Sequence, residues 1–374
     1  MKFTVSTSQL QKQLTIIGGV ISNNPIVPIL ENFLMELENG MLTISASDLQ
    51  TSMTTQLEVT SSDSGSIAVP AKILTDTLKS LSEQPLTIEV DEDSFVVEVH
   101  SANGRYKLAG ENAMDFPKIP ASADGNTINM PTEVLGEAIS NTLFAVSSDE
   151  LRPAMTGVFV ELKSEDITFV ATDGNRLIRY RRTDVGSTYV DSMIIPRKAL
   201  GLLKGALPAD ASEIKIEFSK SNAFFSFNNT RLICRLIDER FPDYDNAIPV
   251  NNPNKMIVDK SVLLNTLKRI AIYANRTTHL IRLKMAQDEL IISAEDLDFS
   301  NEANEKLPCQ YTGEEMEIGF NAKFLIEMLS NIRTKEVKFE MSASNRAGLL
   351  MPSEMEENED ILMLLMPVML NNYA

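Results

Sequence analysis

The chain has 374 residues, 43% of them hydrophobic and 23% charged, which is the composition of a globular protein able to bury the cores of two or three domains. No run of about 18 apolar residues occurs, which argues against a transmembrane helix. The net charge of −18 argues by itself against a nucleic-acid binder, since phosphate-binding proteins usually carry an excess of Lys and Arg.

The first third of the chain alternates between strand and helix patterns. Alternating side chains predict a strand at Lys2–Val5, and apolar residues at helical spacing predict a helix over 7–21. The elements expected after it are strands at 33–37, 41–45, 54–59 and 67–69, a helix over 71–81, and strands at 86–90, 95–100 and 105–109. This order predicts an α+β domain with two helices packed on one side of antiparallel sheets.

Sequence markers repeat at a period of about 125 residues. Aspartates that follow a β-type run recur at Asp48, Asp173 and Asp296, and prolines that close each repeat recur at Pro117, Pro242 and Pro367. Segments in which a short strand leads into a helix, such as SIAVPAKILTDTL and SMIIPRKALGLL, recur at the same period. A period this long fits whole domains. We therefore expect three similar domains, at 1–122, 123–250 and 251–374.

The sequence shows no motif for catalysis or for a cofactor. It has no P-loop, GxGxxG, HExxH or GxSxG pattern, and neither His100 nor His279 has a ligand partner nearby. The repeated aspartates could hold Mg²⁺ for nuclease chemistry, but a feature present in every repeat is more often structural, here an Asp that caps a turn. We expect no catalytic, metal or cofactor site, and buried thiols at Cys234 and Cys309. The first ten residues lack the basic and apolar regions of a signal peptide, so we expect a cytoplasmic chain.

Positive charge is concentrated in the predicted helices. The six predicted helical segments, at 7–21, 71–81, 132–146, 197–206, 259–276 and 321–335, together carry +8, which leaves −26 for the rest of the chain. If the helices share one side of the protein, that side is positive and can attract DNA by counterion release. The helix propensity of Lys and Arg explains only part of this excess. The candidate DNA-facing residues are Lys12, Lys72, Lys79, Arg197, Lys198, Lys204, Lys260, Lys268, Arg269 and Lys323.

Several segments, in their order and spacing, carry a resemblance to a known family. They include NPIVPILENFLMEL, ATDGNRL, RFPDYDNAIP, MEIGFNAKFL and LMPVML. Over its whole length the chain resembles the bacterial DNA polymerase III beta subunits, the sliding clamps. The resemblance implies a head-to-tail homodimer that forms a closed ring of six domains around double-stranded DNA, with the helices lining the hole. It implies a processivity factor, not an enzyme, that tethers the replicative polymerase and is opened by a clamp loader.

The resemblance also implies a groove between the second and third domains that receives short linear motifs from polymerases, the loader and repair proteins. Met and Leu side chains suit such a groove because they repack around different partners. Arg152 and Arg176 would offer hydrogen bonds to a docked peptide, and Met369 stands where the family often has arginine. By the resemblance, the groove residues are Arg152, Met155, Thr172, Gly174, Asn175, Arg176, Leu177, Pro242, Asn246, Ala247, Asn321, Phe324, Leu364, Met366, Pro367, Val368 and Met369.

By the same resemblance, the ring interface uses the strand RYKLAG of the first domain as an exposed edge. Tyr106 and Leu108 of one subunit would meet Ile272 and Tyr273 of the other. The alternative is an internal strand whose side chains pack locally. From the residues alone, two other functions stay open: a metal-dependent nuclease that uses acidic clusters, and a monomeric peptide-binding scaffold with no role on DNA.

Overall fold

The computed structural model describes residues 1–22, 24–120, 125–210 and 212–370. Contacts divide the chain into two compact units, Met1–Gly136 with Lys198–Leu236, and Glu137–Arg197 with Ile237–Ala374. The boundary expected at 122 lies outside the described residues. The boundary expected at 250 falls in the loop before the strand that starts at Asn254.

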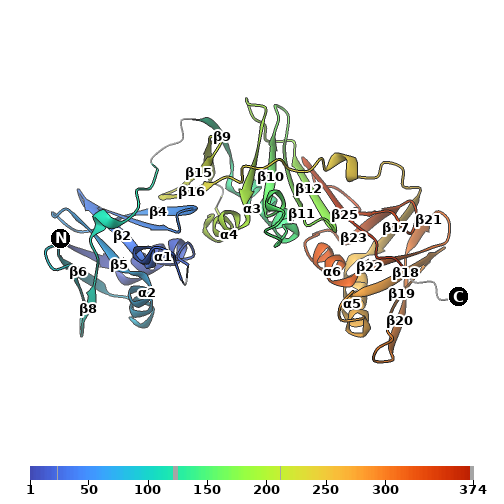
Figure 1. Cartoon of the computed structure of the whole chain (residues 1–374), viewed down its shortest axis with the longest axis horizontal. Helices are drawn as coiled ribbons and strands as arrows, with labels where there is room; N and C mark the ends of the chain where they lie inside the picture. Colours follow the sequence, from blue (N-terminus) through green and yellow to red (C-terminus); the bar gives the residue numbers. More distant parts are fainter. Residues whose placement is uncertain (23, 121–124, 211, 371–374) are drawn as a thin grey trace. The chain divides into compact units, whose positions relative to one another are not determined.

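Six α-helices form within the described ranges (Figure 1). They are α1 (Thr7–Gly18), α2 (Ala71–Ser80), α3 (Thr132–Thr142), α4 (Arg197–Ala206), α5 (Lys260–Ile270) and α6 (Ala322–Ser330). Each helix begins within a residue of the expected position, and several end earlier than expected. The first stops at the Gly18–Gly19 pair, whose helix propensity is low. Because α5 and α6 are also shorter, Arg276, Arg333 and Lys335 lie outside helices.

The strands follow the order predicted from the sequence. The first repeat contains β1 (Lys2–Ser6), β2 (Asn32–Glu38), β3 (Met41–Ser47), β4 (Thr51–Glu58), β5 (Gly65–Pro70), β6 (Pro85–Asp91), β7 (Val96–His100) and β8 (Arg105–Ala109). The second contains β9 (Asn126–Pro131), β10 (Gly157–Leu162), β11 (Ile167–Thr172), β12 (Arg176–Arg182), β13 (Asp191–Pro196), β14 (Glu213–Phe218), β15 (Asn222–Phe227) and β16 (Thr230–Arg235). The third contains β17 (Asn254–Asp259), β18 (Leu280–Ala286), β19 (Glu289–Asp296), β20 (Asn301–Pro308), β21 (Gln310–Thr312), β22 (Met316–Asn321), β23 (Glu336–Met341), β24 (Gly348–Pro352) and β25 (Glu359–Leu365).

The three repeats share one sheet topology, which confirms the expected threefold duplication. One sheet of each repeat runs β1-β6-β7-β8, β9-β14-β15-β16 or β17-β23-β24-β25, and the other runs β5-β2-β3-β4, β13-β10-β11-β12 or β22-β18-β19-β20. The short strand β21 is an addition of the third repeat and pairs with β17. The fold is α+β, with two helices and two antiparallel sheets in every repeat.

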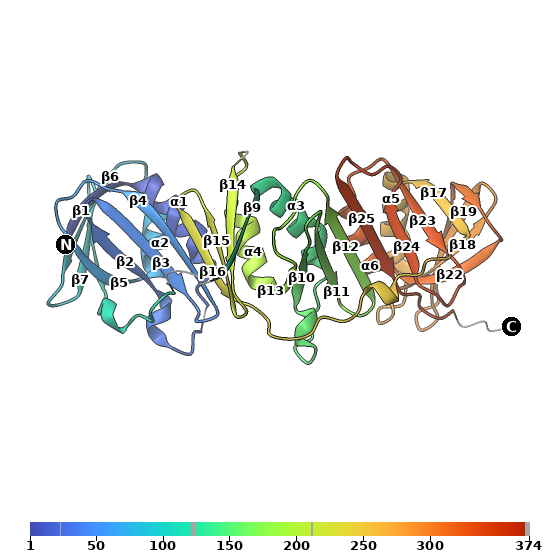
Figure 2. The same cartoon turned by 90° about the horizontal axis from the view of Figure 1, so that it is seen from above.

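Sheets continue across the borders between repeats. In the first unit β4 pairs with β16, and in the second unit β12 pairs with β25. Figure 2 shows the second of these pairings, where β10 to β12 and β23 to β25 form one continuous sheet. Each joint therefore pairs the end strand of the β5-β2-β3-β4 type of sheet in one repeat with the end strand of the β1-β6-β7-β8 type of sheet in the next repeat. We call these the β4–β16 joint and the β12–β25 joint.

Helices bury one apolar stripe each against these sheets. In α1 the stripe is Leu10, Leu14 and Ile17, all fully buried, and the Ser6 hydroxyl caps the helix by accepting the amide of Gln9. In the second unit, Figure 1 shows α5 and α6 on one side of the strands and the segment after β16 on the other. Side chains of β12 alternate between these two sides.

The repeated aspartates cap turns, as the sequence analysis expected. Asp48 Oδ1 accepts the amides of Gln50 and Thr51, and Asp173 Oδ1 accepts the amides of Asn175 and Arg176 at 2.9 and 3.0 Å. In the third repeat Asp296 Oδ1 accepts an amide two residues further on. Each carboxylate thus fixes the hairpin that leads into β4, β12 or β20.

Candidate partner-binding and DNA-facing sites

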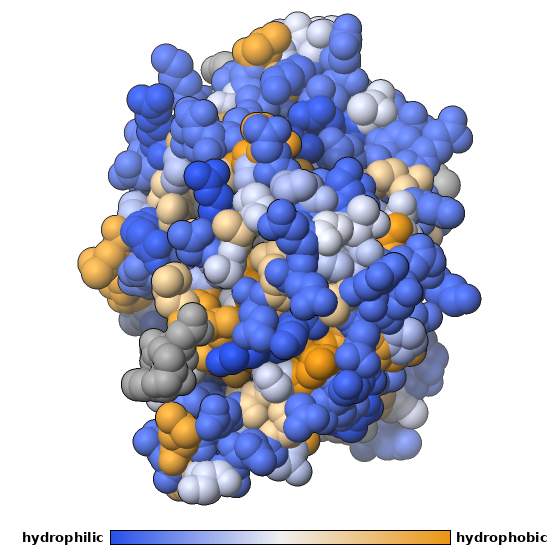
Figure 3. Space-filling view, turned by 90° about the vertical axis from the view of Figure 1, so that its right-hand side faces the viewer, coloured by the Kyte–Doolittle hydropathy of each residue, from blue (hydrophilic) through white to orange (hydrophobic). Residues whose placement is uncertain are grey.

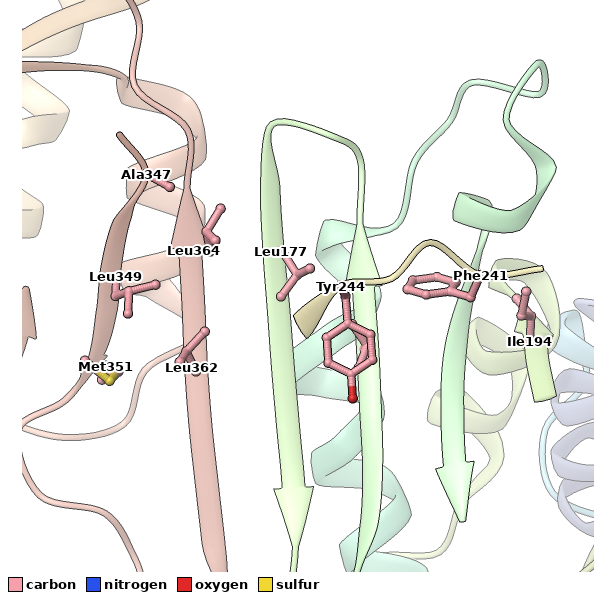
Figure 4. Packing of buried hydrophobic residues seen from close by; sticks show 10 residues of the cluster. Leu177, Ile194, Phe241, Tyr244, Ala347, Leu349, Met351, Leu362 and Leu364 are labelled. Carbon is pink, nitrogen blue, oxygen red and sulfur yellow. The ribbon is translucent and has the colours of Figure 1, made fainter. Parts of the chain in front are cut away.

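A cluster of apolar side chains spans the β12–β25 joint on the face of the sheet away from the helices. Leu177 on β12 lies directly opposite Leu364 on β25. Arg182 lies five residues after Leu177 on β12, so its side chain is on the other face of the sheet. There it pairs with Glu137 of α3 at 2.9 Å. We define the junction cluster as Val170, Leu177, Ile194, Phe241, Tyr244, Ala347, Leu349, Met351, Leu362 and Leu364. It combines residues from the second and third repeats (Figure 4).

Two aromatic residues of the segment between β16 and β17 cover part of this cluster. Phe241 stacks on Phe159 of β10 with ring centroids 4.8 Å apart. Tyr244 packs beside it and donates its hydroxyl to Glu161 at 3.1 Å. Burial, and then the nearby Glu161 carboxylate, raise the pKa of the Tyr244 hydroxyl, so it stays a donor. Figure 4 shows both rings extending from this segment over the strands.

Several of the predicted groove residues lie in the junction cluster or next to it. Leu177 and Leu364 belong to it, and the amide of Met366 donates to the carbonyl of Asn175 at 2.8 Å. Pro242, Asn246 and Ala247 are exposed on the segment that carries Phe241 and Tyr244. Met366 and Met369 are exposed at the end of β25 and beyond it. The chain thus brings together residues separated by nearly 200 positions.

Arg152 and Arg176 differ in how far they are available to a partner. Arg152 is half exposed, pairs with Asp149 at 2.9 Å, and lies so close to Gly174 that a Cβ there would clash with its guanidinium. Its neighbour Asp149 is a surface carboxylate, and its pKa is lowered by the amide of Leu151 and then by Arg152. Arg152 can therefore exchange its partner at little cost.

Arg176, by contrast, has its donors engaged within the chain, and its role as a donor to a peptide stays a prediction. Its guanidinium is only 6% exposed and donates to Asp173 at 3.0 Å, to Glu327 of α6 at 2.7 Å and to the Phe144 carbonyl at 2.7 Å. The Phe324 ring lies 4.7 Å below it. Arg176 therefore ties the turn of the second repeat to α6 of the third. Asn321 is likewise engaged, as the N-cap of α6.

The aromatic and strand residues that make up most of the cluster were not predicted from the sequence. Leu362 comes from β25, which pairs with β12, and Leu349 and Met351 come from β24, which pairs with β25. Only the fold reveals these pairings. Phe241 could have been found, because a Phe-Pro pair precedes the end of the first and second repeats alike, as Phe116 and Phe241.

The β4–β16 joint has the same backbone pairing with different chemistry. Ser52 and Leu177 both lie four residues after the repeated aspartate, and Ser52 faces Ile233 where Leu177 faces Leu364. Two residues further along the strands, the β4–β16 joint has Arg231 where the β12–β25 joint has Leu362. Pairing of the strands therefore does not require apolar side chains on this face. The apolar character of the β12–β25 joint is a separate feature.

Nine of the ten predicted DNA-facing cations lie on exposed helix positions. Lys12, Lys72, Lys79, Arg197, Lys198, Lys204, Lys268, Arg269 and Lys323 are exposed, whereas Lys260 is half buried and donates to the Ile332 carbonyl at 2.7 Å. The negative charge of α3 is partly offset, because Glu137 binds Arg182 and Arg333.

Two of the exposed cations already hold protein partners. Lys198 donates to the Val20 carbonyl at 2.8 Å and pairs with Asp48, so it fastens α4 to the first repeat. Arg269 binds Glu305 through two nitrogen atoms, at 2.8 and 2.6 Å. These two residues are therefore less suited to contact phosphates than Lys204 or Lys268.

Two of the edge strands, β8 and β20, are equivalent to strands that form the joints in the other repeats. β8 and β20 each end a four-stranded sheet, and in the described part of the chain neither has a second neighbour. Tyr106 on β8 is exposed, but Leu108 packs in the core of its own repeat, so only one of the two predicted contact residues is accessible. Ile272 and Tyr273 are exposed near β20. Figure 3 views this end of the second unit, where apolar patches interrupt a hydrophilic surface.

Within the residues described, no cluster of three or more His, Cys, Asp or Glu side chains has the arrangement of a metal site. Across the same residues, no helix is long and apolar enough to cross a membrane. Cys234 and Cys309 are both buried thiols.

Three repeats joined edge to edge, with cations on exposed helix positions and an apolar cluster on the other face of one joint, define a DNA sliding clamp. Comparison with known proteins agrees. The chain matches the N-terminal, central and C-terminal domains of the DNA polymerase III beta subunit over residues 1–120, 129–243 and 245–369. The chain therefore belongs to the DNA polymerase III beta subunit family.

Similar proteins match this chain over nearly all of its length, and a solved one has the same fold. A beta sliding clamp of Proteus mirabilis is 30% identical over 342 residues, which cover 90% of this chain and 92% of that protein. A beta sliding clamp of Haemophilus influenzae is 28% identical, with 97% and 99% covered. The crystal structure of the sliding clamp of Pseudomonas aeruginosa bound to griselimycin is 28% identical and has a TM-score of 0.94, covering 99% of this chain and all of that one.

Proposed function

We propose that this sliding clamp works as a closed ring of two head-to-tail copies around duplex DNA, and that polymerases, a clamp loader and repair proteins dock short linear motifs at the junction cluster. The ring holds DNA by topology, slides along phosphates without reading bases, and raises the effective concentration of the polymerase at the primer end. It catalyses nothing itself and acts in the cytoplasm, where the loader opens it.

The chemistry of the β12–β25 joint is the observation that carries the docking proposal. The same backbone pairing is built with Ser52 and Arg231 at the other joint, so Leu177 and Leu362 are not required by the fold. The cluster itself is buried, and the exposed Met366 and Met369 beside it are the apolar side chains open to a partner. Methionines at its rim suit a site that accepts several partners.

The edges β8 and β20 support the head-to-tail pairing. At both joints within the chain, a strand equivalent to β8 (β16 or β25) pairs with a strand equivalent to β20 (β4 or β12). Tyr106, Leu232 and Met363 are equivalent, since each is reached from Phe3, Ile128 or Met256 through the same three strand pairings.

The register of the joints within the chain can be carried over to the proposed joint between copies. Leu232 pairs with Met53, and Met363 pairs with Ile178. Met53 and Ile178 each lie two residues after the residue of their strand that faces the repeated aspartate across the hairpin. In β20 that position is Ala303, because Asp296 faces Asn301. This register sets Tyr106 of one copy against Ala303 of the other, a large residue against a small one.

The next pair in this register sets Lys107 against Glu302. Opposite charges on facing strands favour pairing. This position corresponds to Leu177 with Leu364 in one internal joint and to Ser52 with Ile233 in the other. The three joints would thus be apolar, hydroxyl-bearing and ionic at one equivalent pair.

Peptide binding tests the docking proposal. We expect a fluorescent peptide with two adjacent large apolar residues to bind the wild-type chain, and Leu177→Ser or Met366→Ser to weaken binding about tenfold or more through the lost apolar contacts. Ile233→Ser, at the position of the β4–β16 joint equivalent to Leu364, is the matched control and should bind normally. Equal affinity of Leu177→Ser and wild type would remove the assignment.

Retention on DNA tests the ring. Loaded clamp should stay on nicked circular DNA and slide off linear DNA, and charge reversal at Lys204 and Lys268 should shorten retention on circles at low salt while leaving peptide binding intact. Unchanged retention would count against helices that line the hole. Loss from circles as fast as from linear DNA would count against topological binding altogether.

A further inference from the structure

One arginine lies within the apolar part of the junction cluster. Arg179 on β12 sits between Val170 of β11 and Leu362 of β25 in the strand register, and both of these neighbours belong to the cluster. Leu177 lies two residues before it on the same face of the strand. A cation in such a position costs desolvation, which calls for a physical reason.

The fold does not supply that reason. The position equivalent to Arg179 is Thr54 in the first repeat, six residues after Asp48, where it lies between Ser45 and Arg231. In the third repeat the equivalent residue is Asn304, which faces Ser293. Small polar residues thus serve the same place in the sheet, and only the β12–β25 joint carries a cation on this strand.

The bonding of Arg179 leaves its capacity unfilled. Its side chain is 16% exposed and pairs with Asp360 at 2.9 Å through one terminal nitrogen, while its buried Nε has no hydrogen-bond partner. Asp360 is itself 37% exposed, and a second guanidinium, that of Arg181, lies 3.9 Å from the same carboxylate oxygen. A guanidinium carries five donors in a planar fork that fits a carboxylate.

We propose that Arg179 selects docked motifs that carry a carboxylate next to their apolar anchors, and that Asp360 holds its place until such a motif binds. The inference rests on the docking of linear peptides at the junction cluster. An incoming carboxylate takes over the pairing of Arg179 from the exposed Asp360, next to apolar side chains that keep water away, where a charge-assisted pair is stronger than at an open surface. The partner is therefore a linear peptide with large apolar side chains and one Asp, Glu or chain-terminal carboxylate.

A peptide series tests this selection. Decapeptides with two adjacent large apolar residues and blocked termini carry Asp or its neutral analogue Asn at each other position in turn, and binding is measured by fluorescence anisotropy. With the wild-type chain, we expect Asp to bind about 5–10-fold tighter than Asn at one position, and this ratio to fall as salt screens the pair.

Variants assign the preference to one residue. Arg179→Thr, which installs the residue of the first repeat and so fits the sheet, should bring the Asp-to-Asn ratio to about one and leave the affinity for the Asn peptide within about twofold. Arg181→Thr should keep the ratio, and Asp360→Asn, which removes the competing carboxylate, should raise affinity for the Asp peptide about two- to fivefold.

The outcomes separate this inference from the docking proposal. Binding of both peptides without discrimination at any position, or a ratio that survives Arg179→Thr, would overturn the role of Arg179 and leave docking in place. Failure of every peptide to bind the wild-type chain would overturn both.

Discussion

If two copies form the proposed ring, reversing the charge of Lys107 should weaken their pairing. In the proposed register, carried over from the joints within the chain, Lys107 of β8 would face Glu302 of β20 in a second copy. Lys107→Glu replaces an attractive pair by a repulsive one, and Glu302→Lys does the same from the other side. The double variant restores opposite charges with the signs exchanged.

The size of the effect follows from the pair and from the symmetry of the ring. A cross-strand ion pair contributes about 0.5 kcal/mol, and a like-charge pair costs a similar amount, so one reversal changes each joint by about 1 kcal/mol. A head-to-tail dimer closes through two such joints. The total of about 2 kcal/mol corresponds to about a 30-fold rise in the dissociation constant of the dimer.

Analytical ultracentrifugation over a dilution series measures this constant. The double variant should return to within about threefold of wild type, and the effect of either single variant should shrink in about 1 M salt, where screening acts over about 3 Å. Lys215→Glu, which reverses a strand lysine away from β8 and β20, is the control and should leave dimerisation unchanged. Single variants that dimerise like wild type, or a double variant no better than either, would refute the register.

Three further predictions concern single side chains. Arg176→Met should lower the free energy of unfolding in urea by about 2–4 kcal/mol, below the full range for a buried pair because Glu327 is half exposed, whereas a loss under 0.5 kcal/mol would contradict its role as a tie. Asp48→Ala should cost about 1–2 kcal/mol in the same assay, because two turn amides and Lys198 lose their acceptor; an unchanged midpoint would show that the turn holds without it. Burial raises the pKa of the Cys234 thiol to about 12, so at pH 8 iodoacetamide should label it only after unfolding, and rapid labelling of the native chain would contradict its burial.

The fold could be predicted from sequence because its information is local and written three times. Alternation in Lys2–Val5, the helical spacing of Leu10 and Leu14, and the aspartates at a period near 125 give the order of elements without knowledge of any long-range contact. Helix ends were less certain, since α5 and α6 stop before the charged residues that follow them.

The site could be predicted only in part, because its chemistry depends on pairing across the chain. The neighbouring sequence does not show that Arg176 donates to Glu327 and the Phe144 carbonyl, or that Lys198 pairs with Asp48, 150 positions away. The burial of Leu108 likewise depends on which face of β8 meets its own repeat. Sequence identifies residue types suited to a surface, whereas the sheet register decides which of them are still available.

In each repeat one sheet ends in a strand equivalent to β4 and the other sheet ends in a strand equivalent to β8. A strand of the first type in one repeat can pair with a strand of the second type in another. Such an arrangement is heterologous, so copies of a single repeat would add to one another head to tail until a circle closed. An ancestral gene with one repeat would therefore already have encoded a self-assembling ring, and gene fusion would have reduced the number of separate pieces without inventing a new contact. The same property means that an isolated repeat leaves the joint strands of both its sheets unpaired, and we expect such a fragment to polymerise.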